Sequence, residues 1–63
     1  MIELVERNAL LWARECGMKG EIVLTEPKKE YFGWTVQLTD QEGRSAQARF
    51  TTEGNPSMWE MYR

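Results

Sequence analysis

The segment 32–50 constrains the fold most, because its residues alternate between apolar and polar. Two runs show the alternation, and their apolar members are Phe32, Trp34, Val36 and Leu38 in the first run and Ala46, Ala48 and Phe50 in the second. Between the runs, Asp40 and Gly43 occupy the first and last places of a four-residue segment that is typical of a tight turn. A period of two gives each strand one apolar and one polar face. The segment therefore predicts an antiparallel β-hairpin with one face in water.

The segment 2–16 carries a different period. Its apolar residues recur at alternating spacings of three and four, as in one face of an amphipathic helix, and they are Ile2, Val5, Ala9, Trp12 and Cys16. Gly17 directly follows this stripe, where a glycine commonly ends a helix, and Met18 can supply the apolar contact that accompanies such an end. We therefore expect an N-terminal helix that ends at Gly17.

Three further segments complete the expected structure. Residues 21–26 are rich in β-branched side chains and are followed by Pro27, which predicts a strand, whereas residues 27–30 look like a polar loop. Asn55 and Pro56 resemble the cap and first residue of a helix, so we expect a short helical turn over residues 58–63.

These elements predict one small α+β domain that covers residues 1–63. An N-terminal amphipathic helix packs on a three-stranded antiparallel sheet, in the order αβββ, and a short C-terminal helical turn follows. Strands adjacent in sequence usually lie side by side, so we place the first strand next to residues 31–40. The polar face of the sheet then contacts solvent or a partner.

Composition argues against several classes of function. The 63 residues include one cysteine and no histidine, so an intramolecular disulfide and the ordinary zinc patterns are excluded. Cys16 is the only conceivable nucleophile, and it lies on the apolar stripe at a helix C-terminus, where the helix dipole opposes a thiolate. The sequence also has no glycine-rich phosphate loop. We expect no enzymatic activity, no catalytic or metal-binding residues and no cofactor.

The sequence also bears on where the protein acts. Glu3 and Glu6 stand where a secretory signal would carry positive charge, and no apolar run approaches the ~20 residues of a membrane span. A single unpaired cysteine fits a reducing compartment. We therefore expect a soluble cytoplasmic protein without membrane contact.

Surplus apolar residues suggest a binding role. Five large side chains lie at the edge of the helix stripe, outside it, or in the C-terminal tail, and we take them as candidates for binding a partner: Leu4, Leu10, Leu11, Trp59 and Tyr62. The expected function is that of a small protein-binding module, an inhibitor, adaptor or immunity-type protein of bacterial or phage origin. Its partner is another protein, or a second copy in a homodimer. The net charge of −2 suits a basic site on such a partner.

Recognition of DNA through the polar sheet face is the alternative. Candidate residues on and around that face are Lys28, Lys29, Gln37, Arg44, Gln47 and Arg49. The spacing of Trp34, Val36, Leu38, Gly43, Arg44, Arg49, Phe50 and Thr52 is similar to that in the arm-type DNA-binding domains of phage integrases, and this resemblance implies DNA reading by three strands. The helix–sheet–helix order also resembles double-stranded-RNA-binding domains. The strands carry Gln and Ala where such binding favours Lys and Arg, so we rank nucleic acid second.

Overall fold

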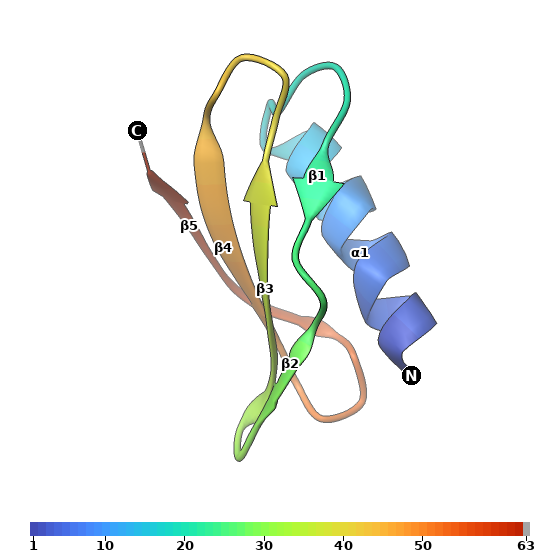
Figure 1. Ribbon diagram of the computed structural model, residues 1–63. Helices are drawn as coiled ribbons and strands as arrows, with labels where there is room; N and C mark the ends of the chain where they lie inside the picture. Colours follow the sequence, from blue (N-terminus) through green and yellow to red (C-terminus); the bar gives the residue numbers. More distant parts are fainter. Residues whose placement is uncertain (63) are drawn as a thin grey trace.

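One helix packs against one antiparallel sheet in the computed structural model, which describes residues 1–62 (Figure 1). The helix α1 spans Ile2–Glu15. Five strands follow in the order β1 (Val23–Leu24), β2 (Lys28–Glu30), β3 (Gly33–Thr39), β4 (Ser45–Phe50) and β5 (Pro56–Tyr62). Across the sheet the order is β1-β3-β4-β5, and β2 pairs with β3 on the same side as β1. The predicted α+β class with an N-terminal helix on an antiparallel sheet is confirmed.

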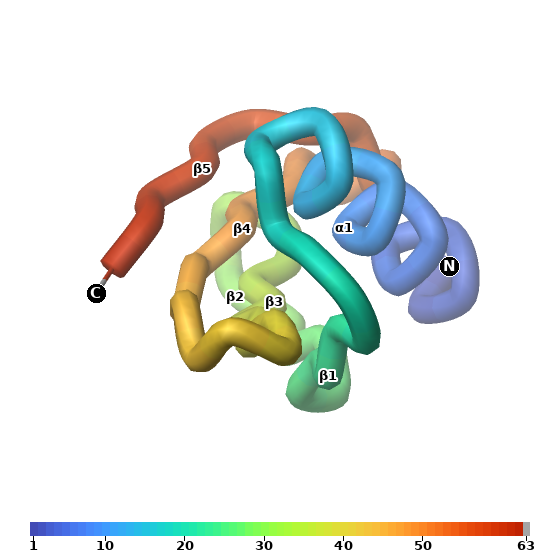
Figure 2. Tube along the Cα trace, turned by 90° about the horizontal axis from the view of Figure 1, so that it is seen from above, coloured from blue at the N-terminus to red at the C-terminus, as the bar shows by residue number. Residues whose placement is uncertain are grey.

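The sheet curves around the helix. Seen from above, the strands form an arc that runs from β5 through β4 and β3 to β1, and α1 lies across the open side of that arc (Figure 2). The space between the two layers holds the core, which consists of Val5, Ala9, Ala13, Met18, Val36, Leu38, Ala46, Ala48 and Phe50. Trp12, Trp34 and Trp59 pack against this cluster from its margins. A single apolar core therefore stabilises the fold.

The helix ends as its sequence predicts. Gly17 has φ +92°, and its N–H donates to the Arg14 carbonyl oxygen (3.2 Å) while the Met18 N–H donates to the Ala13 carbonyl oxygen (3.0 Å). These two bonds define a Schellman motif, and the buried Met18 provides its apolar contact. The buried stripe itself consists of Val5, Ala9 and Ala13, whereas Ile2 is exposed and Cys16 is half-buried.

The central hairpin has the predicted alternation. Strands β3 and β4 pair in one register from Trp34 opposite Phe50 to Thr39 opposite Ser45. On the side that faces α1, the buried residues of these two strands are Val36, Leu38, Ala46, Ala48 and Phe50. Gln37 and Thr39 are exposed on the other side. We call the face of the sheet that points away from α1 the outer face.

The first edge of the sheet differs from the prediction. A strand was expected over residues 21–26 and a polar loop over 27–30, but β1 contains only Val23 and Leu24, and Lys28–Glu30 forms β2. Both pair with β3, as expected for the first strand. Pro27 is buried between the two short strands and has no N–H to give to the ladder. Pro27 therefore divides this edge of the sheet into two short strands, whereas the prediction had the edge strand end before Pro27.

The helical turn predicted over residues 58–63 is wrong for residues 58–62, and so is the count of three strands; Arg63 lies outside the described residues. Residues 56–62 form β5, which pairs with β4 from Met58 opposite Arg49 to Tyr62 opposite Ser45. Asn55 does not cap a helix: its carbonyl oxygen accepts the Thr51 N–H (2.8 Å), which closes the loop before β5. One isolated helical turn is unstable, whereas pairing with β4 satisfies the backbone of the segment.

Candidate functional site

Strand β5 forms one edge of the sheet, and part of its backbone faces outward. On the opposite edge, the Thr25 N–H donates to the Gln37 carbonyl oxygen (2.9 Å) and the Gln37 N–H donates to Thr25 Oγ1 (3.0 Å). The N–H and C=O groups of Gln37 thus point toward β1. Because the direction of these groups alternates along an antiparallel strand, those of the neighbouring Val36 and Leu38 point toward β4.

The same alternation carries across to β5. The N–H and C=O groups of Ala46 and Ala48 point toward β3. Those of Gln47, which lies between them, therefore point toward β5, where Glu60 is the residue opposite. It follows that the N–H and C=O groups of Trp59 and Met61 point away from the sheet. Within residues 1–62, no strand pairs with that side of β5.

The two edges of the sheet are built differently. The edge formed by β1 and β2 consists of pieces of two and three residues, interrupted by Pro27 and carrying Lys28 and Lys29. Short pieces, proline and lysine are the devices by which natural sheets prevent pairing with other chains. Strand β5 has seven residues, and only its start is protected, by Pro56 and a register shift opposite Arg49 and Phe50. Its remaining length is open.

Apolar side chains flank the open strand on both faces. Met58 and Tyr62 lie on the outer face, and Met58 is 52% exposed. Trp59 and Met61 lie on the helix side, where they are paired with Ala48 and Ala46. On α1, Leu11 is 58% exposed. We define the edge surface as the open side of β5 together with Leu11, Met58, Trp59, Met61 and Tyr62.

A shallow hollow continues the edge surface onto the helix. It lies between α1 and the start of β5, and its lining residues are Asn8, Leu11, Trp12, Glu15 and Pro56. The ring of Trp12 in this lining contacts the Trp59 ring, with centroids 5.4 Å apart. The hollow is therefore walled by aromatic and aliphatic groups and bordered by one carboxylate.

Tyr62 closes the far end of the edge surface. Its hydroxyl donates to Gln47 Oε1 (2.7 Å) and lies 3.4 Å from Glu60 Oε1. Desolvation and the neighbouring Glu60 carboxylate raise the pKa of Tyr62, so the side chain is a neutral donor at neutral pH. The hydrogen bond to Gln47 fixes the ring on the outer face.

The structure separates the five predicted partner-binding residues. Leu11, Trp59 and Tyr62 belong to the edge surface. Leu4 is half-buried beside the loop that precedes β5, close to Gly54. Leu10 is half-buried and lies two residues, or about 200° of helix rotation, from Trp12, so it faces the opposite flank of α1. Sequence reasoning missed Met58 and Met61, whose place on an edge strand was hidden by the expected helical turn.

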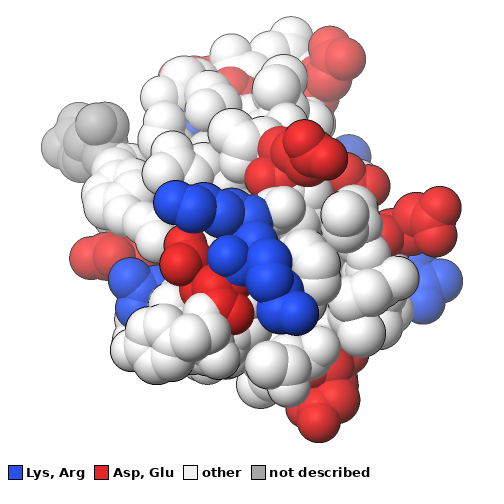
Figure 3. Space-filling view, turned by 60° about the horizontal axis from the view of Figure 1, so that its bottom comes forward, with Lys and Arg blue, Asp and Glu red and all other residues white. Residues whose placement is uncertain are grey.

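The predicted nucleic-acid residues are divided between locations. Lys28, Gln37, Gln47 and Arg49 lie on the outer face, as their pairing with outer-face residues shows. Lys29 lies on the other face, with its ammonium group 5.1 Å from the Trp34 ring centroid. On the face that Figure 3 shows, a central band of basic atoms is bordered by acidic ones, and other basic atoms lie apart from it.

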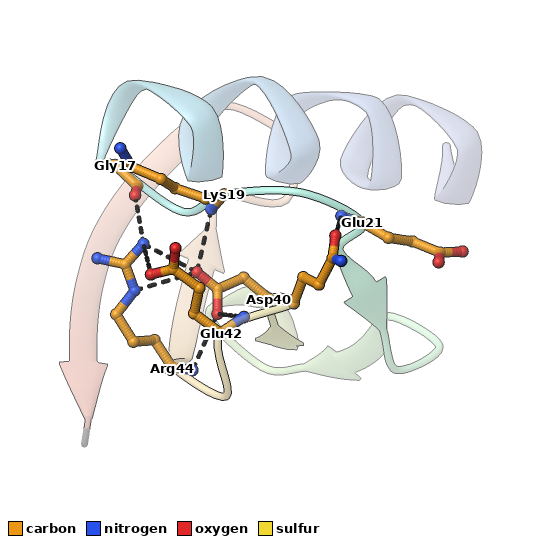
Figure 4. Close-up of polar contacts among 7 residues, drawn as sticks. Gly17, Lys19, Glu21, Asp40, Glu42 and Arg44 are labelled. Carbon is orange, nitrogen blue, oxygen red and sulfur yellow. Dashed lines mark hydrogen bonds and ion pairs between the residues drawn. The ribbon is translucent and has the colours of Figure 1, made fainter.

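Arg44, the remaining nucleic-acid candidate, belongs to a polar cluster around the buried Asp40 (Figure 4). The Asp40 carboxylate accepts the N–H groups of Lys19 (3.0 Å), Glu42 (3.0 Å) and Arg44 (2.9 Å), and the Arg44 guanidinium (3.0 Å). The guanidinium also donates to the Gly17 carbonyl oxygen (2.7 Å). This cluster ties the β3–β4 turn to the end of α1.

The charge of Asp40 follows from this environment. Burial of the carboxyl group raises its pKa, but the hydrogen bonds from Lys19 and Arg44 and the Arg44 charge outweigh that effect and lower the pKa below its usual value. Asp40 is therefore ionised at neutral pH and fully engaged in structure. A role for Arg44 in binding a phosphate would break this cluster.

Other reactive groups are few. Burial, together with the neighbouring Glu15 carboxylate, raises the pKa of the half-buried Cys16 thiol, which lowers its thiolate fraction. Among residues 1–62, His, Cys, Asp and Glu form no group of three with the spacing of a metal site. Tyr31, at the β2–β3 turn, is 96% exposed and packs edge-on against Phe32 (5.3 Å between centroids).

The fold and its edge surface define a small α+β domain with one open sheet edge. Comparison of the chain with models of protein families, with curated proteins and with solved structures finds no match. None of the helices in the described part of the chain has the length and apolar character needed to cross a membrane.

Proposed function

We propose that this protein is a non-enzymatic protein-binding module and that the edge surface is its binding site. One observation carries the proposal: β5 presents the outward-pointing N–H and C=O groups of Trp59 and Met61 along an edge with which no other strand of residues 1–62 pairs, between apolar side chains on both faces. An extended segment can add to such an edge as a further strand.

Each part of the edge surface has a role in this mode of binding. Main-chain hydrogen bonds to β5 supply affinity for an extended backbone, and alternate side chains of that backbone contact opposite faces of the sheet. Met58 and Tyr62 meet those on the outer face, whereas Trp59, Met61 and the hollow beside Leu11 meet those on the helix side. Trp, Tyr and Met are the residue types enriched in protein interfaces.

The wider biological role follows the sequence-based expectation. We infer an inhibitor, adaptor or immunity-type protein that acts in the cytoplasm of a bacterium or of a phage-infected cell. The net charge of −2 favours encounter with a partner segment that carries basic residues.

Peptide selection with two matched variants tests the proposal. Met61→Pro removes an outward-pointing N–H without removing a bond to β4, whereas Met61→Leu keeps that N–H and nearly the same side-chain volume. We expect peptides selected from a random display library on the immobilised wild-type chain to bind Met61→Leu and to lose at least tenfold in affinity for Met61→Pro. Equal binding to both variants would overturn the proposal.

DNA binding through the outer face is the second candidate, since Lys28, Gln37, Gln47 and Arg49 share that face. Replacement of Lys28 and Arg49 by Glu should then abolish retention on a random duplex, while Arg44, which belongs to the Asp40 cluster, stays unchanged. If the wild-type chain does not bind the duplex at low salt, where phosphate contacts are strongest, this candidate is excluded.

A further inference from the structure

We propose that the edge surface binds a second copy of this chain, with the two β5 strands antiparallel about a two-fold axis and Trp59 opposite the partner's Trp59. This inference rests on the proposed function, because it names the occupant of the same surface. It extends the sheet without interruption from one protomer into the other.

Symmetry and backbone direction limit how two β5 strands can pair. Only residues whose N–H and C=O groups point outward can exchange hydrogen bonds, and in the regular part of β5 these are Trp59 and Met61. Three symmetric arrangements follow: Trp59 lies opposite the partner's Met61, Trp59 lies opposite the partner's Trp59, or Met61 lies opposite the partner's Met61. The third gives Trp59 no partner among residues 1–62, so the first two are compared. The side chains between these positions decide which arrangement forms.

Charge selects the second arrangement. With Trp59 opposite the partner's Met61, Glu60 would lie directly opposite the partner's Glu60, and like charges in that position are destabilising. With Trp59 opposite the partner's Trp59, Glu60 instead lies opposite the partner's Met58. Met58 is paired with Arg49 on the outer face, so each Glu60 enters the row of side chains that contains an Arg49 of the other copy. This complementarity occurs twice by symmetry.

The same register brings apolar groups together on the helix side. The two Trp59 rings meet at the axis, each already in contact with its own Trp12. The partner's Met61 comes level with Ser57, beside Pro56 in the lining of the hollow. A methionine is long and flexible enough to fill an irregular apolar hollow of this kind. Leu11 in the same lining would lose its exposure to water.

The construction of the other edge explains why pairing stops at two copies. The β1 and β2 pieces are short, interrupted by Pro27 and carry two lysines, so they offer no continuous template. A two-fold contact uses the same patch on both copies and closes on itself. One open edge in each chain therefore gives a dimer and not a fibre.

The oligomeric state in solution is the first test. We expect sedimentation equilibrium to give twice the 7.4 kDa chain mass for the wild type and for Met61→Leu, and a dissociation constant at least tenfold weaker for Met61→Pro. Near-ultraviolet circular dichroism must show that Met61→Pro remains folded. A wild-type mass of one chain at millimolar concentration would overturn the inference.

Disulfide trapping in a Cys16→Ser background tests the register and does not depend on the proline variant. In the proposed dimer Met58 lies opposite the partner's Glu60 in a non-hydrogen-bonded pair, at a Cα separation of about 4.5 Å that suits a disulfide. Each of these residues lies diagonally from its own symmetry mate, at about 7–8 Å, which is too far. An equimolar mixture of Met58→Cys and Glu60→Cys chains should therefore crosslink, and Met58→Cys, which keeps Glu60, should not crosslink alone. In the rejected register Met58 would lie opposite the partner's Tyr62, so crosslinking of Met58→Cys with Tyr62→Cys chains, both of which keep Glu60, would overturn the proposed register.

These outcomes separate this inference from the proposed function. A monomeric chain that binds selected peptides through Met61 overturns the dimer and supports the edge surface as a binding site. A monomeric chain that selects no peptide overturns both.

Discussion

Gly33 shows how one residue can fix the approach of two strands. It has φ +144°, and a Cβ atom added to it would collide with the Phe50 carbonyl oxygen. Only glycine tolerates both conditions, since other residues rarely adopt positive φ and carry the atom that would collide. Gly33 begins β3 next to the exposed turn at Tyr31 and Phe32, so it lets that turn form directly beside the end of β4.

Substitution of Gly33 by Ala should destabilise the fold more than the same substitution at Gly43. At Gly43, φ is +84° and an added Cβ atom would have no neighbour within 4 Å, so only backbone strain of about 1 kcal/mol is expected. At Gly33 the collision adds to the strain, and we expect a loss of at least about 2 kcal/mol. Urea unfolding of both variants measures the difference. Equal losses would show that the backbone relaxes at Gly33.

Asp40 is the residue whose charge the fold uses most. Its carboxyl group is inaccessible to solvent, and it accepts hydrogen bonds from the Lys19 N–H in the segment after α1, from the β3–β4 turn and from the Arg44 side chain. These bonds favour the ionised form, so the pKa of Asp40 is lower in the folded state than in the unfolded chain.

The free energy of unfolding should therefore decrease as the pH is lowered, in part because Asp40 becomes protonated. A lowered folded-state pKa means that its contribution is complete above the unfolded pKa of about 3.9 and is lost as pH falls through the folded pKa. Melting temperatures measured between about pH 6 and about pH 2 should decrease along this range. Asp40→Asn, which cannot titrate, should be less stable at neutral pH and should show a flatter acid limb. Parallel acid limbs would contradict this role.

At the scale of elements, small residues set the distance between helix and sheet. Ala9 and Ala13 of α1 and Ala46 and Ala48 of the sheet are all buried in the same cluster. The larger side chains Phe50, Leu38, Val36 and Val5 fill the rest of the cluster, and at its margin Trp12 meets the Phe50 ring edge-on, with centroids 5.7 Å apart. The two layers can therefore approach closely over the alanines.

Enlargement of one alanine should separate the layers. Ala48→Leu adds three carbon atoms to a filled interior, and such overpacking costs about 1–3 kcal/mol. Gln37→Leu is the matched control, because Gln37 is exposed on the outer face of the adjacent strand and the change should stay within about 0.5 kcal/mol. Thermal unfolding of both variants measures the contrast. A neutral Ala48→Leu would show that the interior contains unfilled space.

The elements that were predicted correctly are those that local pattern determines. The helix and its end at Gly17 follow from period and capping, and the β3–β4 hairpin follows from alternation and its turn residues. The β5 strand could not be distinguished from a helical turn, because Asn55 and Pro56 suit a helix start and the segment from Met58 onward is short. Pairing with β4 decides its conformation, and that contact lies outside the local sequence.

The candidate site was predictable only in part for the same reason. Leu11, Trp59 and Tyr62 were identified as surplus apolar residues, but the open edge that relates them depends on β5 being a strand. Arg44 was assigned to a nucleic-acid surface because its spacing fits a sheet, whereas the partners that occupy it, Gly17 and Asp40, come from two separate turns. Long-range hydrogen bonds of this kind leave no periodic signal.

At the scale of the whole molecule, the proposed dimer links stability to concentration. Association stabilises only the folded state, so the melting temperature should rise with protein concentration, by about 3–6 °C for each tenfold increase. Because the proposed interface is mainly apolar, added salt should not weaken this dependence. Differential scanning calorimetry at several concentrations measures it. The Met61→Pro variant, whose dimer is expected to be weaker, should melt at a lower temperature at each concentration, and a wild-type melting temperature that does not change with concentration would contradict the link.

The contact between Trp12 and Trp59 has a consequence for synthesis of the chain. The two residues are 59 − 12 = 47 positions apart. At about 5–20 residues per second, a ribosome adds Trp59 roughly 2–10 s after Trp12. During that interval the helix can form, but its indole has no strand to cover it. The contact between the two rings, and the cover that β5 gives to Trp12, can therefore form only late in the synthesis of residues 1–62, after Trp59 has been added.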